Sequence, residues 1–173
     1  MLSFITTDAA IERDFLEQSL KQVTDSSYNM LTVDGDTSTN DTVLVLANGL
    51  ARNKPITTGS ADAQIFQSAL LKVAVLLTRE LARDGEGASR LLTIEVEGAS
   101  DTASARQAAR TIASSSLVKS AVYGSDPNWG RVLAALGRSG IETAENKIDL
   151  FVNGVCIMES GTPIPFHKEA VVV

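Results

Sequence analysis

The longest amphipathic pattern in the chain begins at residue 62, and it constrains the fold more than any other feature. Asp62 is a favourable N-cap, and apolar residues follow it at helical spacing: Ile65, Phe66, Ala69, Leu70, Val73, Leu76, Leu77 and Leu81. The pattern stops at Asp84-Gly85-Glu86-Gly87, where two glycines permit backbone angles that other residues resist. We therefore predict a long helix that turns this whole apolar side inward.

The segments before this helix predict a first layered unit over residues 1–90. Met1–Ile5 is typical of an apolar strand, and Asp8 is placed to cap a helix with the apolar face Ile11, Phe15, Leu20 and Val23. Thr42–Ala47 is apolar on both faces, which is typical of a buried central strand.

The remaining segments predict a second, smaller unit over residues 91–173. Leu92, Ile94 and Val96 alternate with polar residues as in a half-buried strand. A helix over Asp101–Ser115, a strand over Leu117–Tyr123, another helix and a hairpin at Asn153-Gly154 follow, with Val155–Met158 as the returning strand. This order predicts an α/β (α+β) fold with mixed layers. Because strand-like segments occupy both ends, including Ala170–Val173, we expect a subunit or fragment of a larger protein.

Composition excludes several classes of function. The chain has 173 residues, 44% of them hydrophobic, and its net charge of −6 with no basic run argues against nucleic-acid binding. No apolar run is long enough to span a membrane, and a single cysteine favours a reducing, cytoplasmic setting. One cysteine and one histidine cannot build a zinc site. We expect Cys156 to pack as a small hydrophobe and His167 to lie in a surface loop.

A polar loop precedes the strand over Thr42–Ala47. Its acidic and amide residues fall at alternate positions from Asp34, but Thr39 and Val45 replace the glycine and glutamate that an EF-hand needs, so calcium binding is rejected. Two interpretations stay open for Ser38, Thr39, Asn40 and Asp41. They either hydrogen-bond their own backbone at the strand entrance or also line a pocket.

The segment Gly124–Arg131 contains the only tryptophan and a helix-start signal. Asp126 suits the N-cap and Pro127 the first helical position, so the exposed N–H groups of the first turn, with Asn128 and Arg131, suit a carboxylate or phosphate. The alternative is a capped helix whose Trp129 packs in the core and whose Arg131 pairs with an acid.

Glu86 poses a similar choice. Gly85 and Gly87 flank it, so its carboxylate is either a clamp for an ammonium group or a solvated turn residue.

Four motifs taken together resemble the β chain of the ornithine acetyltransferase family, the glutamate N-acetyltransferases of arginine biosynthesis. In chain order they are Met1–Ala9, Asp34-Gly35 with Ser38–Thr42, Asp84–Ser89, and Leu117–Lys119 with Gly124–Val132. The resemblance implies a layered mixed-sheet sandwich like that of the DmpA aminopeptidase group, whose members carry an N-terminal nucleophile.

The resemblance also implies a mechanism. Members of the family are cut autocatalytically before a threonine, which takes the acetyl group from N2-acetylornithine and passes it to glutamate. That threonine would lie immediately before Met1, so no catalytic residue is expected in this chain, which alone would be inactive. Glu86 matches the substrate-binding glutamate, while Asn40, Asp41, Asn128 and Arg131 are candidate pocket residues, and no metal is expected.

Partners follow from the same resemblance. An α chain from the same precursor would join this β chain in an α2β2 heterotetramer that uses no bound cofactor. Acetyl-CoA is a second acetyl donor in bifunctional members, and the sequence does not decide whether it is used here. Two other hypotheses stay open, a catalytically dead binding or assembly module and an amide hydrolase of the same fold.

Overall fold

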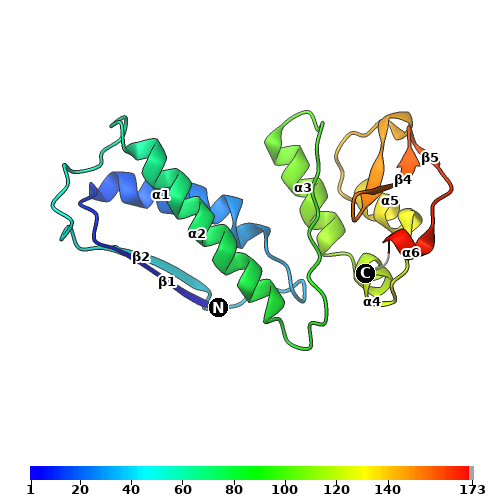
Figure 1. The fold of residues 1–173 in the computed structure, drawn as a ribbon, viewed down its shortest axis with the longest axis horizontal. Helices are drawn as coiled ribbons and strands as arrows, with labels where there is room; N and C mark the ends of the chain where they lie inside the picture. Colours follow the sequence, from blue (N-terminus) through cyan, green and yellow to red (C-terminus); the bar gives the residue numbers. More distant parts are fainter. Residues whose placement is uncertain (172–173) are drawn as a thin grey trace. The chain divides into compact units, whose positions relative to one another are not determined.

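Two parallel strands, β1 (Leu2–Thr7) and β2 (Thr42–Ala47), organise the first part of the computed structural model, which describes residues 1–171 (Figure 1). Their register pairs Leu2 with Thr42 and Thr7 with Ala47. The chain divides into two compact units, Met1–Glu86 and a second unit that begins at Gly87. Helices and both parallel and antiparallel strands occur, so the predicted α+β class is confirmed.

Only one face of the parallel strand pair is covered within this chain. Ile5, Val43 and Val45 pack toward the helices, whereas Leu2 is 67%, Phe4 61%, Leu44 41% and Leu46 55% exposed. Successive side chains of a strand point to opposite faces, so this alternation accounts for the split. The prediction of a strand buried on both faces is therefore wrong for β2 in this chain.

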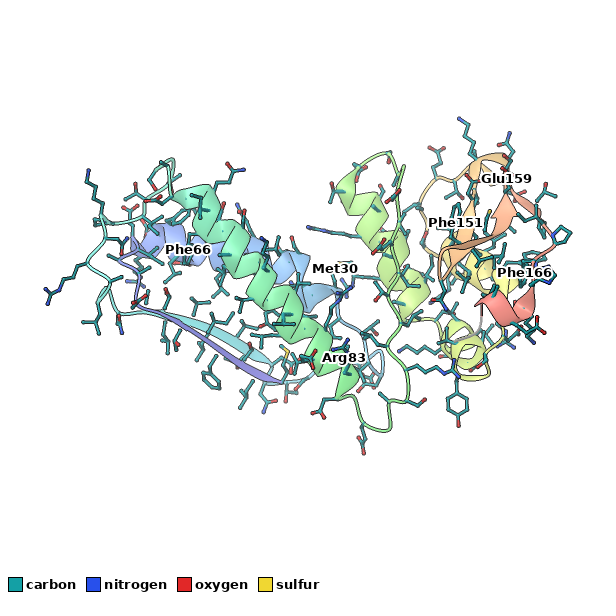
Figure 2. The ribbon with its side chains drawn as sticks, in the orientation of Figure 1. Met30, Phe66, Arg83, Phe151, Glu159 and Phe166 are labelled. Atoms are coloured by element: carbon teal, nitrogen blue, oxygen red, sulfur yellow. The ribbon has the colours of Figure 1, made fainter. Side chains whose placement is uncertain are left out.

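Two helices, α1 (Arg13–Ser26) and α2 (Ala63–Arg83), lie on the same side of the strand pair (Figure 1). A short 3-10 helix, η1 (Tyr28–Met30), follows α1. The buried residues of this core are Val23, Tyr28, Leu70 and Ala74. The Tyr28 hydroxyl hydrogen-bonds the buried Ser3 hydroxyl at 2.6 Å, so neither polar group is buried without a partner. Phe66, labelled in Figure 2, places its ring 6.2 Å from that of Phe15 on α1.

Two details of these helices differ from the sequence predictions. Helix α1 begins at Arg13 rather than next to Asp8, because residues 8–12 are hydrogen-bonded to the loop before α2, including Glu12 N–H to Ile56 O at 2.9 Å. On α2, the core side is narrower than predicted. Ile65, Val73 and Leu76 point outward and are 68%, 42% and 59% exposed.

The second unit combines short helices with a small antiparallel sheet. Its elements are α3 (Thr102–Ala113), α4 (Ser116–Tyr123), α5 (Trp129–Arg138), the 3-10 helix η2 (Glu145–Lys147), β3 (Leu150–Val152), β4 (Val155–Glu159), β5 (Thr162–Pro163) and α6 (Lys168–Val171). The strand order is β3-β4-β5. Ile112, Val118 and Ala135 form a core between α3, α4 and α5, and Ile157 and Met158 on β4 are fully buried.

The hairpin at Asn153-Gly154 is confirmed, but three predicted strands are not. Residues 117–123 form helix α4, and residues 170–171 belong to helix α6, while 172–173 lie outside the described residues. Leu92 and Ile94 pack against the helical core with alternating exposure, yet residues 91–97 pair with no strand among residues 1–171. Helix α5 begins at Trp129, with Asn128 rather than Asp126 as its N-cap.

The start of α3 gives a pH-dependence prediction. Hydrogen bonds from the Ser104 backbone N–H and hydroxyl, and from the Ser100 hydroxyl, lower the pKa of Asp101 below its ordinary 3.8. A carboxyl with a lowered folded-state pKa stabilises the fold above its unfolded pKa, and this contribution disappears as pH falls through the folded pKa.

Asp101→Asn is expected to keep the cap but to remove this acid-dependent contribution, because asparagine is a good N-cap that does not titrate. Thermal unfolding followed by circular dichroism between about pH 7 and pH 3 measures the difference. An identical acid-induced loss in wild type and Asp101→Asn would contradict the assignment.

Candidate functional site

Asp41 lies at the amino-terminal edge of the parallel strand pair, next to Met1. The amino-terminal ammonium group of Met1 forms an ion pair with one carboxylate oxygen of Asp41 at 2.7 Å, and the Thr42 N–H donates to Met1 O at 3.1 Å. Parallel strands begin at the same edge of a sheet, so the register brings together residues about 40 positions apart. The structure thus joins the first residue of the chain to the polar loop that the sequence had singled out.

Asn40 shapes the turn that presents Asp41. The Ser38 hydroxyl donates to Asn40 Oδ1 at 2.9 Å, and the Thr42 hydroxyl donates to Asn40 O at 3.2 Å. The Asn40 N–H in turn lies 3.4 Å from Ser38 Oγ. The predicted hydrogen bonding of a side chain to its own backbone is therefore confirmed for Ser38. The pocket role of Asn40 and Asp41 stays a prediction.

Glu86 follows the carboxyl-terminal end of α2, whose last residue, Arg83, is labelled in Figure 2. It is exposed, and its carboxylate has no hydrogen-bond or ion-pair partner among residues 1–171. Gly87 adopts a φ of +70°, a backbone angle that a residue with a Cβ resists. The exposed carboxylate of Glu86 is compatible with both interpretations, a clamp for an ammonium group and a solvated turn residue.

Asn128 and Arg131 lie together at the start of α5, where both serve local structure. Asn128 Oδ1 accepts the Arg131 N–H at 3.1 Å, and Asn128 Nδ2 donates to Asp126 at 2.9 Å. The Arg131 guanidinium donates to the Leu117 carbonyl oxygen at 3.0 Å. Asn128 therefore acts as the N-cap, and the side chain of Arg131 ties α5 to α4.

For Gly124–Arg131, the alternative prediction was a capped helix with Trp129 in the core and Arg131 paired with an acid, and it is wrong on both of these contacts. Trp129 is 39% exposed rather than packed in the core, and Arg131 is bound by a carbonyl rather than by an acid. Ser125 adopts a φ of +52°, and its hydroxyl accepts from the Arg90 guanidinium at 2.7 Å. The sequence analysis missed this contact, and no signal in the sequence links Arg90 to a residue 35 positions away.

The described residues offer little for metal or cysteine chemistry. Within residues 1–171, no group of three or more His, Cys, Asp and Glu side chains is placed to hold a metal ion. His167 is exposed in a loop, and the thiol of Cys156 on β4 donates to Met158 O at 3.2 Å, in agreement with their predicted placements. None of the helices in this part of the chain is both long and apolar enough to cross a membrane.

The candidate residues fall into the two separate units. Met1, Asn40, Asp41 and Glu86 belong to the first, whereas Asn128 and Arg131 belong to the second. The contact between Asp41 and Met1 is a second contact that the sequence analysis did not predict. The sequence predicts both strands and the polar loop before β2. It does not predict their parallel register, which is what brings Asp41 next to Met1.

Comparison with known proteins places this geometry in a family. The model of the ArgJ family matches residues 1–172. A crystal structure of the arginine biosynthesis bifunctional protein ArgJ from Bacillus halodurans matches with a TM-score of 0.96 and 43% identity, over 99% of this chain and 80% of the solved chain. The predicted ornithine acetyltransferase fold is thereby confirmed.

Curated relatives agree with this match. The arginine biosynthesis bifunctional protein ArgJ of Symbiobacterium thermophilum is 52% identical over 98% of this chain and 42% of its own length. The protein of the same name from Bacillus subtilis is 46% identical over 97% of this chain and 41% of its own length. The chain thus spans about two fifths of the curated relatives that it matches. These matches bear out the resemblance carried by the four motifs, and the chain belongs to the ArgJ family.

Proposed function

We propose that this chain is the β part of an acetyltransferase of arginine biosynthesis, which transfers an acetyl group from N2-acetylornithine to glutamate through an acetyl-threonine intermediate. The observation that carries the proposal is the family match over residues 1–172, together with relatives named for arginine biosynthesis. The nucleophilic threonine would directly precede Met1. The rest of the precursor would supply the α chain of an α2β2 assembly in the cytoplasm.

The lengths of the matched proteins support a two-chain protein. This chain covers 80% of the solved Bacillus halodurans chain but 42% of the Symbiobacterium thermophilum protein, so the solved chain is about half as long as that relative. A precursor cut into two chains near its middle explains this difference in length. Cleavage before the threonine that precedes Met1 would place the new terminus one residue ahead of the residue that contacts Asp41.

In the proposed reaction the threonine hydroxyl oxygen attacks the acetyl carbonyl carbon of N2-acetylornithine. The hydroxyl is inert at its ordinary pKa, and the freed α-amine of the same residue acts as the base that takes its proton. The bond from the acetyl carbon to the ornithine nitrogen breaks, and ornithine leaves as an amine after receiving that proton. The glutamate amine then attacks the acetyl ester, which regenerates the hydroxyl and releases N-acetylglutamate.

An experiment on the complete protein tests the proposal. Intact-mass analysis should find two chains, the larger beginning with threonine before Met1, and labelled N2-acetylornithine should add one acetyl group to that chain. Transfer of the label to glutamate supports an acetyltransferase, whereas release of labelled acetate without glutamate supports an amide hydrolase. A chain that begins at Met1 and takes up no label would support a binding module. Acetyl-CoA as the labelled donor tests the second activity.

Glu86→Gln in the complete enzyme is expected to raise KM for N2-acetylornithine about 10- to 100-fold with little change in kcat. The reason is the loss of a charge-assisted hydrogen bond to the ammonium group of the ornithine moiety, a contact made equally in the ground state and the transition state. Steady-state kinetics with Glu97→Gln as a matched exposed control measures the effect. Unchanged KM values for both ornithine and N2-acetylornithine would refute the role of Glu86.

A further inference from the structure

We propose that Arg90 is a positioning residue for Glu86: by hydrogen-bonding Ser125, it holds the segment that presents the Glu86 carboxylate to the ammonium group of the substrate. The inference rests on the proposed function for the role of Glu86. Its structural basis is the contact from the Arg90 guanidinium to the Ser125 hydroxyl oxygen at 2.7 Å, which joins residues 35 positions apart.

The position of Glu86 depends on the backbone that carries it. Within residues 1–171, its carboxylate has no hydrogen-bond or ion-pair partner, and residues 86–90 are exposed and belong to no helix or strand. The chain just before this segment is fixed, because the Asp84 N–H closes the last turn of α2 by donating to Glu80 O at 3.0 Å. The segment after Glu86 therefore needs an anchor of its own.

The Arg90 side chain supplies that anchor within the second unit. Ser125 lies in the turn between α4 and α5, and its N–H donates to Val122 O at 3.2 Å, so the turn is bonded back onto α4. A guanidinium bonded to Ser125 is thus attached to folded structure. Because Arg90 follows Glu86 by four positions, only residues 87–89 separate Glu86 from this point of attachment.

The backbone of Ser125 supports a specific use of its hydroxyl. Its φ is +52°, in the left-handed region where a residue with a Cβ is strained. Glycine would adopt this angle at lower energy but has no hydroxyl to accept from Arg90. Backbone strain of this kind is concentrated at functional sites, and here the strained residue supplies the acceptor of a charge-assisted hydrogen bond.

A held segment lowers the cost of binding. Ordering flexible residues costs conformational entropy, and a segment that is already ordered in the free protein avoids that cost when the ligand binds. Arg90 should therefore affect the affinity for the ammonium group, and with it KM, while the acetyl-transfer step and kcat stay unchanged. Arg90 would act through Glu86, without touching the substrate.

The test uses variants of the complete protein. Arg90→Ala and Ser125→Gly are each expected to raise KM for N2-acetylornithine about 3- to 10-fold, with kcat within about twofold of wild type. Arg90→Lys should keep KM within about twofold, because an ammonium group can donate to the same hydroxyl oxygen. Ser160→Gly is the matched control, since Ser160 also has a positive φ, +49°, in the second unit, and it should keep the wild-type KM.

A double variant tests whether Arg90 acts through Glu86. Glu86→Gln already removes the charge that Arg90 is proposed to position, so adding Arg90→Ala should raise KM by less than about twofold more. A further increase as large as that of Arg90→Ala alone would overturn the inference. A wild-type KM for Arg90→Ala would do the same, as would a KM for Ser160→Gly as high as that for Ser125→Gly.

Limited proteolysis reports on the segment without any substrate. A glutamate-specific protease should cut the bond after Glu86 at least about threefold faster in Arg90→Ala and Ser125→Gly than in wild type and Ser160→Gly, because proteases cut flexible segments preferentially. The masses of the fragments identify the bond that is cut. Equal cleavage rates in the four proteins would contradict an anchoring role for Arg90.

Calorimetry with ornithine separates this inference from the proposed function. The Kd for ornithine should be about 3- to 10-fold higher in Arg90→Ala than in wild type, and this measurement needs no acetyl transfer. A wild-type protein that binds ornithine but transfers no acetyl group would refute the proposed function alone. An equal Kd in wild type and Arg90→Ala would refute the role of Arg90 and leave the proposed function standing.

Discussion

Gly161→Ala is expected to destabilise the second unit by about 2–5 kcal/mol. Gly161 lies in the turn between β4 and β5 with a φ of +76°, where a side chain is strained. An added Cβ would overlap the Glu145 carbonyl oxygen and lie 2.8 Å from its carbon and 3.3 Å from Asn146 Cα. These atoms are backbone, and the Gly161 N–H donates to Ile148 O at 2.8 Å, so neither segment can withdraw without losing contacts.

Gly154→Ala separates backbone strain from overlap. Gly154, in the hairpin between β3 and β4, has a φ of +79°, but an added Cβ would meet no atom within 4 Å. Its substitution should therefore cost only about 1–2 kcal/mol. Denaturant unfolding of the two variants measures the difference, and hydrogen exchange in β4 locates it. Equal losses of stability for Gly161→Ala and Gly154→Ala would contradict the expected overlap between a Cβ at residue 161 and the backbone of η2.

The sequence correctly predicts those elements in which the apolar pattern and the capping or turn residues indicate the same structure. Thr42–Ala47 forms a strand with the predicted ends, and Asp101 caps α3 through the Ser104 N–H at 2.8 Å. The Asn153-Gly154 turn joins two strands as predicted, with positive φ at both residues. In each case local sequence preference and tertiary packing favour the same element.

The segment Leu117–Tyr123 shows where apolar pattern alone fails. Its valines and tyrosine favour a strand, but Ser115 accepts the Val118 N–H at 3.4 Å and caps a helix. Val118 and Ala121, three residues apart, are then the buried positions, which is helical spacing. A short apolar run does not distinguish strand from buried helix, so packing against Ile112 and Ala135 decided the outcome.

The sequence singles out candidate site residues but does not predict their contacts. The polar loop around Asp41 was recognised from composition, yet its neighbour Met1 follows only from the parallel register of β1 and β2. Asn128 and Arg131 were selected for their chemistry, and the structure gives both a role in capping or joining helices. Sequence identifies groups that can bind a ligand, whereas the three-dimensional contacts show which of them are already occupied.

Leu70→Ala is expected to destabilise the first unit by about 2–5 kcal/mol, while Leu76→Ala, on the same helix, should change its stability by less than about 0.5 kcal/mol. Leu70 is 5% exposed and packs in the core with Val23, Tyr28 and Ala74, so truncation leaves a cavity there. Leu76 is 59% exposed, and alanine is the better helix former.

The pair is matched in residue type, helix and substitution, so the difference between the two variants reports burial alone. The apolar spacing of α2 predicted both leucines as inward, because a helical pattern gives the side of the helix but not the width of the covered stripe. Denaturant unfolding of the complete protein measures both variants. A loss from Leu76→Ala comparable to that from Leu70→Ala would show that this outer side of α2 is covered in the complete protein.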